Sequence, residues 1–169
     1  MIKPKKYNRE SIVNKRITVI GLGISGKAVS ILANQLGAIV YASDSNSSEE
    51  IISNAMDLIH DHHIATETGI HTKKIYDSDL WIVSPGVSAK SKIIKEAFNH
   101  NIPIVSEIEF ASWFTKFPII GITGSNGKTT TTYILNQMFK EDQKAVVIGG
   151  NIGIPFSECI LKEILHPSH

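Results

Sequence analysis

A glycine-rich stretch in the second half of the chain has the composition of a phosphate-binding loop. It runs from Ile119 to Thr130 and reads Ile-Ile-Gly-Ile-Thr-Gly-Ser-Asn-Gly-Lys-Thr-Thr, so an apolar run enters a turn that closes on Gly-Lys-Thr. A bound phosphate needs several converging backbone N–H donors, which requires glycines where a Cβ would clash. Lys128 would then reach the β- and γ-phosphates of a nucleotide, and Thr129 would offer its hydroxyl to Mg²⁺.

The spacing of this loop differs from the usual G-x-x-x-x-G-K-[ST] pattern. The residue five before Gly127 is Ile122, and the nearby glycines are Gly121 and Gly124. An ordinary glycine turn between a strand and a helix is the alternative, but it does not explain why Lys-Thr follows the last glycine directly. Threonines at 129–132 open the helix although each costs roughly half a kcal/mol relative to alanine in a helix interior. We therefore favour the phosphate loop.

The composition limits the class of protein. The 169 residues are 42% hydrophobic and 20% charged with a net charge of +1, so the chain can bury a core and gives no case for a nucleic-acid or membrane surface. The lone cysteine, Cys159, excludes an internal disulfide, suits a reducing compartment and is expected to be buried. Because the sequence has neither a membrane-length apolar run nor a secretory signal at its start, we expect a cytoplasmic protein.

Residues 16–105 alternate short β-branched runs with longer amphipathic stretches. We expect strands at 17–20, 39–42, 64–67, 80–83 and 102–105, and helices at about 25–36, 49–61 and 90–99. This alternation predicts an α/β fold with a parallel sheet and right-handed crossovers. Residues 1–15 are polar and basic, which predicts a frayed or loosely docked N-terminal tail.

Residues 106–169 predict the beginning of a second α/β domain, of the P-loop ATPase type. A connecting helix at 106–116 precedes a strand at 117–123, the phosphate loop, a helix, and a strand at 145–149. The helix carries i, i+4 apolar pairs and is expected to pack on a sheet; its apolar residues are Ile134, Leu135, Met138 and Phe139. Two parallel strands with one crossover cannot bury both faces of a sheet, so this domain is expected to be incomplete.

A second glycine loop follows the first expected strand. Residues 21–26 read Gly-Leu-Gly-Ile-Ser-Gly, a G-x-G-x-x-G that opens a helix, and Asp44 follows the second strand. This arrangement presents a helix N-terminus to a pyrophosphate and places an acid beside a sugar or base, which predicts a Rossmann-like domain. The pattern accepts any nucleotide diphosphate, so NAD and a UDP-sugar both stay open, as does a turn without a ligand.

Two further turns are candidates for ligand contacts. Ser84-Pro85-Gly86-Val87 follows the fourth strand and should lie at the same carboxyl edge as the first glycine loop, where open α/β sheets bind ligands. Residues 149–153 follow the last expected strand and would place Asn151 beside the phosphate loop. By itself each is ordinary turn chemistry.

The histidine-rich end of the second helix does not have metal-ligand spacing. His60, His62 and His63 close a polar helix and lack a second ligand cluster, so we expect a solvated helix end. The sequence also lacks a Ser/His/Asp arrangement or paired carboxylates that would indicate a nucleophile.

The combination of these motifs resembles the Mur ligases, the ATP-dependent amide-forming enzymes of peptidoglycan precursor synthesis. The variant phosphate-loop spacing is that family's own, and the segments at 21–26, 84–87, 107–110 and 149–155 are most similar to its D-glutamate-adding members. The resemblance runs from about residue 16 to 158. It implies a UDP-substrate domain and a central ATP domain, the substrates UDP-MurNAc-L-Ala and D-glutamate, ATP and Mg²⁺ as cofactors, and a monomer at full length.

The resemblance also implies which residues form each site. By this resemblance, the residues that contact the UDP end of the substrate are Ile24, Ser25, Asp44, Ser45, Ser84, Pro85 and Gly86, and Asn151 lies near the muramoyl part. The resemblance implies that the residues that bind ATP are Gly124, Ser125, Asn126, Gly127, Lys128, Thr129 and Thr130. Among them, Lys128 and Thr129 are implied to be catalytic, and Thr129 is implied to be a metal ligand. The family often has a basic residue at the position of Asn46.

The family's reaction activates the substrate carboxylate as an acyl phosphate, which the amine of D-glutamate attacks. Lys128 would neutralise charge on the transferred phosphoryl group. The family's other Mg²⁺ ligands, its carbamylated lysine and its third domain have no counterpart here, and residues 159–169 leave the pattern. We therefore expect an N-terminal portion without turnover of its own. The alternatives are an L-alanine-adding ligase, an NAD(P)-binding redox or regulatory module, and a non-catalytic UDP-sugar-binding module.

Overall fold

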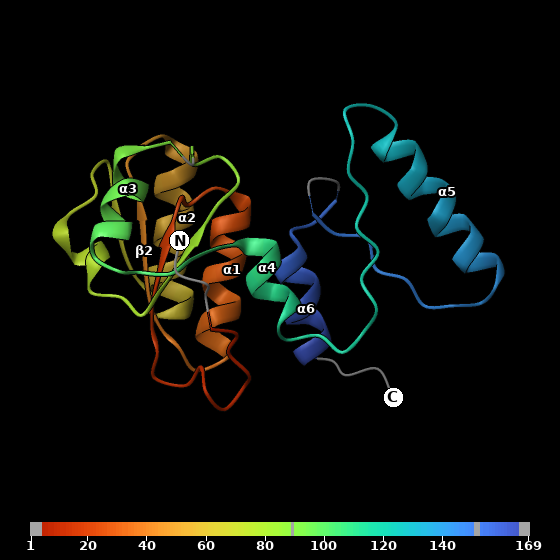
Figure 1. Ribbon diagram of the computed structural model, residues 1–169, viewed down its shortest axis with the longest axis horizontal. Coiled ribbons are helices and arrows are strands. Elements are labelled where there is room, and N and C mark those ends of the chain that lie inside the picture. Colours follow the sequence, from red (N-terminus) through yellow and green to blue (C-terminus); the bar gives the residue numbers. More distant parts are fainter. Residues whose placement is uncertain (1–4, 89, 151–152, 166–169) are drawn as a thin grey trace.

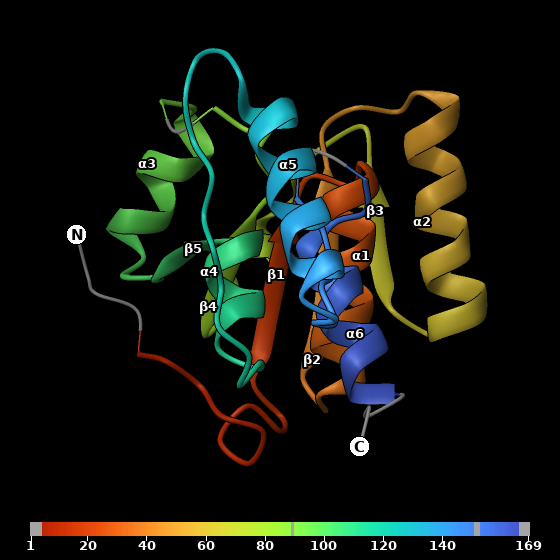
Figure 2. The same cartoon turned by 90° about the vertical axis from the view of Figure 1, so that its right-hand side faces the viewer.

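The computed structural model describes residues 5–88, 90–150 and 153–165 of the chain. Within these residues the centre is a five-stranded parallel sheet of order β3-β2-β1-β4-β5, whose strands are labelled in Figure 2. The strands are β1 (Arg16–Ile20), β2 (Ile39–Asp44), β3 (Ala65–Thr68), β4 (Leu80–Val83) and β5 (Ile104–Ser106). The Rossmann-like parallel sheet expected from the first part of the sequence is confirmed.

Helices cover both faces of the sheet. They are α1 (Ile24–Gln35), α2 (Glu49–His62), the 3₁₀ helix η1 (Lys73–Tyr76), α3 (Lys92–Asn99), α4 (Glu107–Ser112), α5 (Lys128–Glu141) and α6 (Phe156–Leu165). Residues of α1, α2, α4 and α6 share one buried cluster with the sheet, whereas η1 and α3 pack on the opposite face. None of these described helices is long and apolar enough to cross a membrane.

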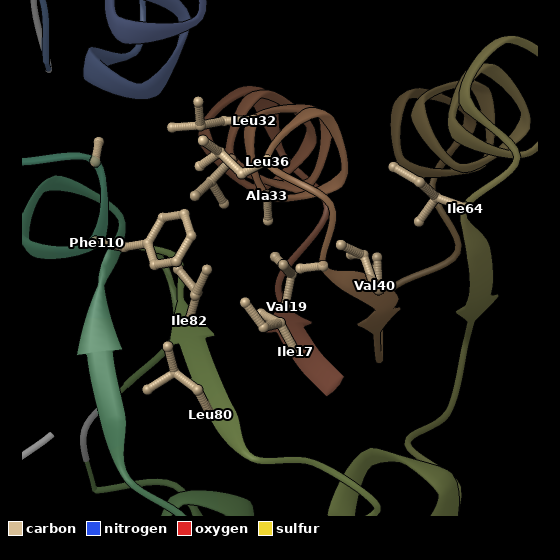
Figure 3. Close-up of a cluster of buried hydrophobic side chains, with 14 of the residues drawn as sticks. Ile17, Val19, Leu32, Ala33, Leu36, Val40, Ile64, Leu80, Ile82 and Phe110 are labelled. Atoms are coloured by element: carbon tan, nitrogen blue, oxygen red, sulfur yellow. The ribbon is translucent and has the colours of Figure 1, made fainter. Parts of the chain in front are cut away.

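Alternation along β1 assigns its side chains to the two faces. Ile17 and Val19 are buried in the cluster with α1, and Figure 3 shows them pointing toward Leu32 and Leu36 of that helix. The hydroxyl of Thr18 points to the other face and donates to the carbonyl of Ile75 in η1 at 3.1 Å. Both faces of the strand are therefore buried from Ile17 to Ile20, where Thr18 is the one polar residue.

Helix α6 packs on α1 and α4, far from it in the sequence (Figure 1). The carboxylate of Glu107, only 2% exposed, accepts hydrogen bonds from the backbone N–H and the hydroxyl of Ser157, both at 2.6 Å. Cys159 and Ile160 are buried on the same helix, so the expected burial of the cysteine is confirmed. One buried acid thus joins the start of α6 to the start of α4.

The prediction of two strands in the second half of the chain is wrong. Neither 117–123 nor 145–149 forms a strand; the pairing described there is an isolated bridge between Gly149 and Ile154. Helix α5 has no buried residue among those described, so the prediction that it packs on a sheet is also wrong. Figure 1 shows α5 standing apart from the layers, and in Figure 2, turned by 90°, it lies in front of them. A strand exists only through hydrogen bonds to a neighbouring strand, and these apolar runs have none within the described chain.

The segment before β1 is docked more firmly than a loose tail. Ile12 is fully buried in the main core cluster, and the N–H of Asn14 donates to the carbonyl of Gly37 at 2.8 Å. The N–H of Ile39 donates to the carbonyl of Lys15 at 2.8 Å. A single apolar residue with these backbone bonds fixes a stretch whose composition alone indicates a tail.

Replacing Glu107 by alanine tests the junction with α6. We expect E107A to lower the free energy of unfolding by about 2 to 4 kcal/mol, because the N–H and O–H of Ser157 would remain buried without an acceptor. The matched control is E109A, because Glu109 is exposed on the same helix and its loss should cost less than about 1 kcal/mol. Urea unfolding of the three proteins measures the difference, and equal midpoints for both variants would contradict the assigned role of Glu107.

Candidate nucleotide-binding cleft

A cleft of about 740 Å³ opens at the carboxyl ends of β1, β2 and β4. It lies where the strand order reverses, between β1 and β4, which is the usual ligand position in open α/β sheets. Seven of the expected substrate residues line it, namely Ile24, Ser25, Asp44, Ser45, Ser84, Pro85 and Gly86. The eighth, Asn151, falls outside the described residues. The fold brings these seven together from three loops, and their contact with a ligand stays a prediction.

The floor of the cleft is held together at Gly21. Its φ of +95° belongs to the left-handed region, and its N–H donates to the carbonyl of Ser43 at 2.8 Å. Its carbonyl accepts from the hydroxyl of Ser84 at 3.1 Å. A Cβ on Gly26 would lie 1.8 Å from the same carbonyl oxygen. The first turn of α1 can therefore approach this carbonyl only because residue 26 is glycine. The ends of β1 and β2, the loop after β4 and helix α1 therefore meet at one residue, Gly21.

Asp44 closes the glycine loop from the side of β2. One carboxylate oxygen accepts from the N–H of Leu22 at 2.7 Å, and the other accepts from the N–H of Asn46 at 2.8 Å. The side-chain oxygen of Asn46 in turn accepts from the N–H of Ser48, at 2.9 Å. The amide of Asn46 thus shapes the turn into α2.

The N-terminus of α1 is available to an anion. Gly23 precedes the helix and no side chain caps it within the described structure. Open space surrounds the position that a Cβ of Gly23 would take, on the cleft side of the loop. The first turn of the helix thus directs backbone N–H groups and the positive end of its dipole toward the cleft.

A polar network that the sequence analysis missed lies beside Asp44. The hydroxyl of Ser43 is 2.7 Å from both Glu67 Oε1 and His71 Nδ1, and His71 lines the cleft. Glu67 also accepts from the N–H and the hydroxyl of Thr72, at 2.9 and 2.7 Å. The signal that would have found His71 is its place just after β3, at the same carboxyl edge as the other loops.

This network shifts three pKa values. Burial raises the pKa of Glu67, but the hydrogen bonds from Thr72 and Ser43 outweigh it, and the net pKa lies below the usual value. Burial lowers the pKa of His71, which the nearby charges of Glu67 and Asp44 only partly oppose. Burial and the hydrogen bond to Glu67 raise the pKa of Tyr41 to about 12. At neutral pH the carboxylate is charged and the imidazole is neutral.

The phosphate loop lies apart from the cleft, and none of the described cleft-lining residues belongs to it. Gly124 and Gly127 have φ of +149° and +77°, so the two glycines supply the curvature expected of them. The ammonium of Lys128 folds back onto the carbonyls of Gly124 and, at 3.3 Å, Ser125. Asn126, Thr129 and Thr130 are exposed around the start of α5. The loop has the curvature and the cation that a phosphate requires.

The described residues hold no group of three or more His, Cys, Asp or Glu side chains placed to bind a metal. His60 and His63 are exposed at the end of α2, and His63 closes the helix in the left-handed conformation with φ of 56°. The end of α2 is therefore capped by its own backbone, as for a solvated helix end.

Comparisons with known proteins match both halves of the chain. The family model of the MurD N-terminal domain matches residues 16–93, and that of the Mur ligase middle domain matches residues 122–163. The UDP-N-acetylmuramoylalanine–D-glutamate ligase of Chlorobium chlorochromatii is 38% identical over 154 residues, which cover 89% of this chain and 32% of that protein. The enzyme of the same name from Chlorobium phaeobacteroides is 39% identical over 158 residues, 90% of this chain and 33% of its own length.

A solved structure shares the fold. A murein peptide ligase from Psychrobacter arcticus superposes with a TM-score of 0.53 at 20% identity, over 82% of this chain and 31% of its own. The chain spans about a third of the length of the curated relatives it matches.

Alanine at Gly26 tests the junction below the cleft. G26A should lower the free energy of unfolding by about 3 kcal/mol or more, because its Cβ would overlap the carbonyl oxygen of Gly21. G23A is the matched control: its Cβ meets no atom within 4 Å, so its cost should stay below about 1 kcal/mol. Thermal unfolding followed by circular dichroism compares the two, and a G26A protein as stable as G23A would refute the close approach.

Proposed function

The chain belongs to the Mur ligase family, and from that premise we propose that it is the N-terminal portion of a cytoplasmic D-glutamate-adding ligase. The proposed reaction is ATP-dependent amide-bond formation between UDP-MurNAc-L-Ala and D-glutamate, by way of an acyl phosphate, in peptidoglycan precursor synthesis. The observation that carries the proposal is the cleft at the switch point of the sheet, which collects three loops around an uncapped helix N-terminus. We assign residues 16–105 to the UDP-substrate domain and 106–169 to part of the central domain.

The cleft suits a nucleoside diphosphate attached to a sugar. Backbone N–H groups near Ile24 and Ser25 face the position of a pyrophosphate at the start of α1. Asp44 and Ser45 lie at the end of β2, where an acid accepts from ribose hydroxyls or a base. The turn 84–86 lines the other side and would contact the part of the ligand beyond the phosphates. A volume of about 740 Å³ is within the range of small-molecule sites.

The phosphate loop suits ATP. Gly124, Ser125, Asn126 and Gly127 provide backbone donors, and Lys128 would exchange two carbonyl partners for anionic phosphate oxygens. Thr129 and Thr130 follow at the start of α5, where the hydroxyl of Thr129 would ligate Mg²⁺ and the helix dipole favours an anion. Bound ATP supplies the phosphoryl group, and Lys128 stabilises the charge that develops on it.

The first test is calorimetric titration of the chain with UDP-MurNAc-L-Ala, UDP and NADH. We expect both uridine ligands to bind at least tenfold more tightly than NADH. D44A should weaken uridine binding at least tenfold, because the carboxylate at the end of β2 is an acceptor in the cleft. D61A is the matched control, since Asp61 is exposed on α2. Binding of NADH alone would replace the proposal by a redox or regulatory module.

The second test concerns turnover of the 169-residue chain. With ATP, Mg²⁺, D-glutamate and UDP-MurNAc-L-Ala we expect no steady release of phosphate, because the phosphate loop is exposed and none of its described residues lines the cleft. Phosphate release that requires D-glutamate and disappears in K128A would show that the chain alone is a complete catalyst. Offering L-alanine with UDP-MurNAc in parallel separates the L-alanine-adding reaction.

A further inference from the structure

The carboxylate of Glu107 caps the start of α6 from a distant part of the chain. One of its oxygens, Oε1, accepts from both the backbone N–H and the hydroxyl of Ser157, and the two residues are 2% and 0% exposed. N–H groups in the first turn of a helix have no acceptor within the helix, and an anion there also meets the positive end of the helix dipole. Glu107, the first residue of α4, therefore fixes where α6 begins.

The turn before α6 is packed directly on that helix. We call its described residues, 148–150 and 153–155, the α6 turn. A Cβ on Gly149 would lie 2.5 Å from Sγ of Cys159, so the turn approaches the helix more closely than a side chain at this position allows. The thiol of Cys159 also donates to the carbonyl of Ile148 at 3.8 Å. The place of the α6 turn is therefore set by the first turns of α6.

The N-terminal turns of α1 and α6 are neighbours at the edge of the nucleotide-binding cleft. The two helices pack against each other (Figure 1), and residues of both line a second hollow of about 310 Å³. Its lining includes Ile24 and Lys27 from the start of α1 and Glu158 from the start of α6. Ile24 lines the cleft as well, so the hollow and the cleft share a wall. The α6 turn, which precedes Glu158, thus lies beside the end of α1 at which phosphates belong.

The sheet order places the α6 turn on the side of the cleft away from the ribose position. An acid that ends β2 holds the ribose when the phosphates lie at α1, so a group attached beyond the phosphates extends away from β2. Helix α6 packs on α1 and α4, and α4 packs on β4 and β5, which lie on the other side of β1 from β2. The α6 turn therefore stands where the distal half of a nucleoside diphosphate sugar would pass.

We propose that Glu107 is a positioning residue for the sugar half of the substrate: by capping α6, it holds the α6 turn in contact with the group beyond the diphosphate. The assignment rests on the proposed function, which supplies a UDP-linked muramoyl substrate. Glu107 lines neither the cleft nor the hollow, so its effect passes through the bonds to Ser157. Loss of the cap should therefore weaken the sugar contacts and leave the contacts to the uridine diphosphate intact.

The test compares UDP with UDP-MurNAc-L-Ala by calorimetry. Wild type should bind the full substrate at least tenfold more tightly than UDP. E107A should bind UDP within about twofold of wild type but should prefer the full substrate by no more than about twofold, whereas a merely structural role would weaken both ligands equally. E107Q should retain most of the preference, because its amide oxygen still accepts from Ser157. A tenfold preference retained by E107A, or a wild type without preference, would overturn the proposal.

Amide hydrogen exchange tests the positioning without any ligand. The N–H of Gly150 donates to the carbonyl of Ile154 at 2.8 Å within the α6 turn, so it should be protected in wild type. E107A should accelerate its exchange at least tenfold more than that of Val19, in the centre of β1, because the turn opens locally while the sheet stays closed. Equal acceleration at both amides would mean that Glu107 contributes only to global stability.

Two further variants complete the exchange experiment. E109A removes an exposed carboxylate of α4 and should leave both amides as they are in wild type. S157A removes only the hydroxyl donor; it replaces E107A if that variant does not fold, and it should shift the exchange and the ligand preference in the same direction. The failures are distinguishable: absence of UDP binding refutes the proposed function, whereas UDP binding with an unchanged preference in E107A or S157A refutes the role of Glu107 alone.

Discussion

The backbone of Gly21 is the constraint on which the rest of the cleft depends. Its N–H is bonded to the end of β2 and its carbonyl to the loop after β4, while the first turn of α1 presses on the same oxygen. Three chain segments contact the backbone of this one residue only because position 26 lacks a side chain and Gly21 adopts a positive φ. The uncapped helix N-terminus, the carboxylate of Asp44 and the turn at Ser84 face one another as a result.

The N-terminal half of the fold could be predicted because the sequence of each strand already has the pattern of a buried parallel strand. The runs at Arg16–Ile20 and Leu80–Val83 are apolar on both faces, as buried parallel strands must be, and glycine turns separate them from the helices. The apolar run at Ala145–Ile148 has the same local composition, yet Val147 is 73% exposed. Composition records the propensity to form a strand, whereas a strand also needs a neighbour, and a neighbour is not a local property.

The parts of the site that depend on backbone conformation could be predicted, because they require glycines at recognisable spacings. The parts that depend on contacts between side chains of neighbouring strands could not. Glycines with positive φ and a lysine at a helix start have recognisable spacing, so both glycine loops were visible. His71, Ser43 and Glu67 lie on different segments without a motif, and only the pairing of β2 with β3 brings Ser43 opposite Glu67. The buried bond between Glu107 and Ser157, 50 residues apart, was likewise invisible in the sequence.

The distribution of burial separates the two candidate ligand sites energetically. Each described element around the cleft contributes to one of two buried clusters, so its shape is maintained by the same apolar contacts that stabilise the sheet. Among the described residues, the phosphate loop is supported only by its own turn and by the exposed helix α5. The ammonium of Lys128 donates hydrogen bonds to carbonyl groups of the loop. Anion binding there must displace those contacts, which weakens affinity, whereas the cleft is formed in advance. The proposed recognition of a nucleotide at the cleft therefore does not require that the phosphate loop be folded against a sheet.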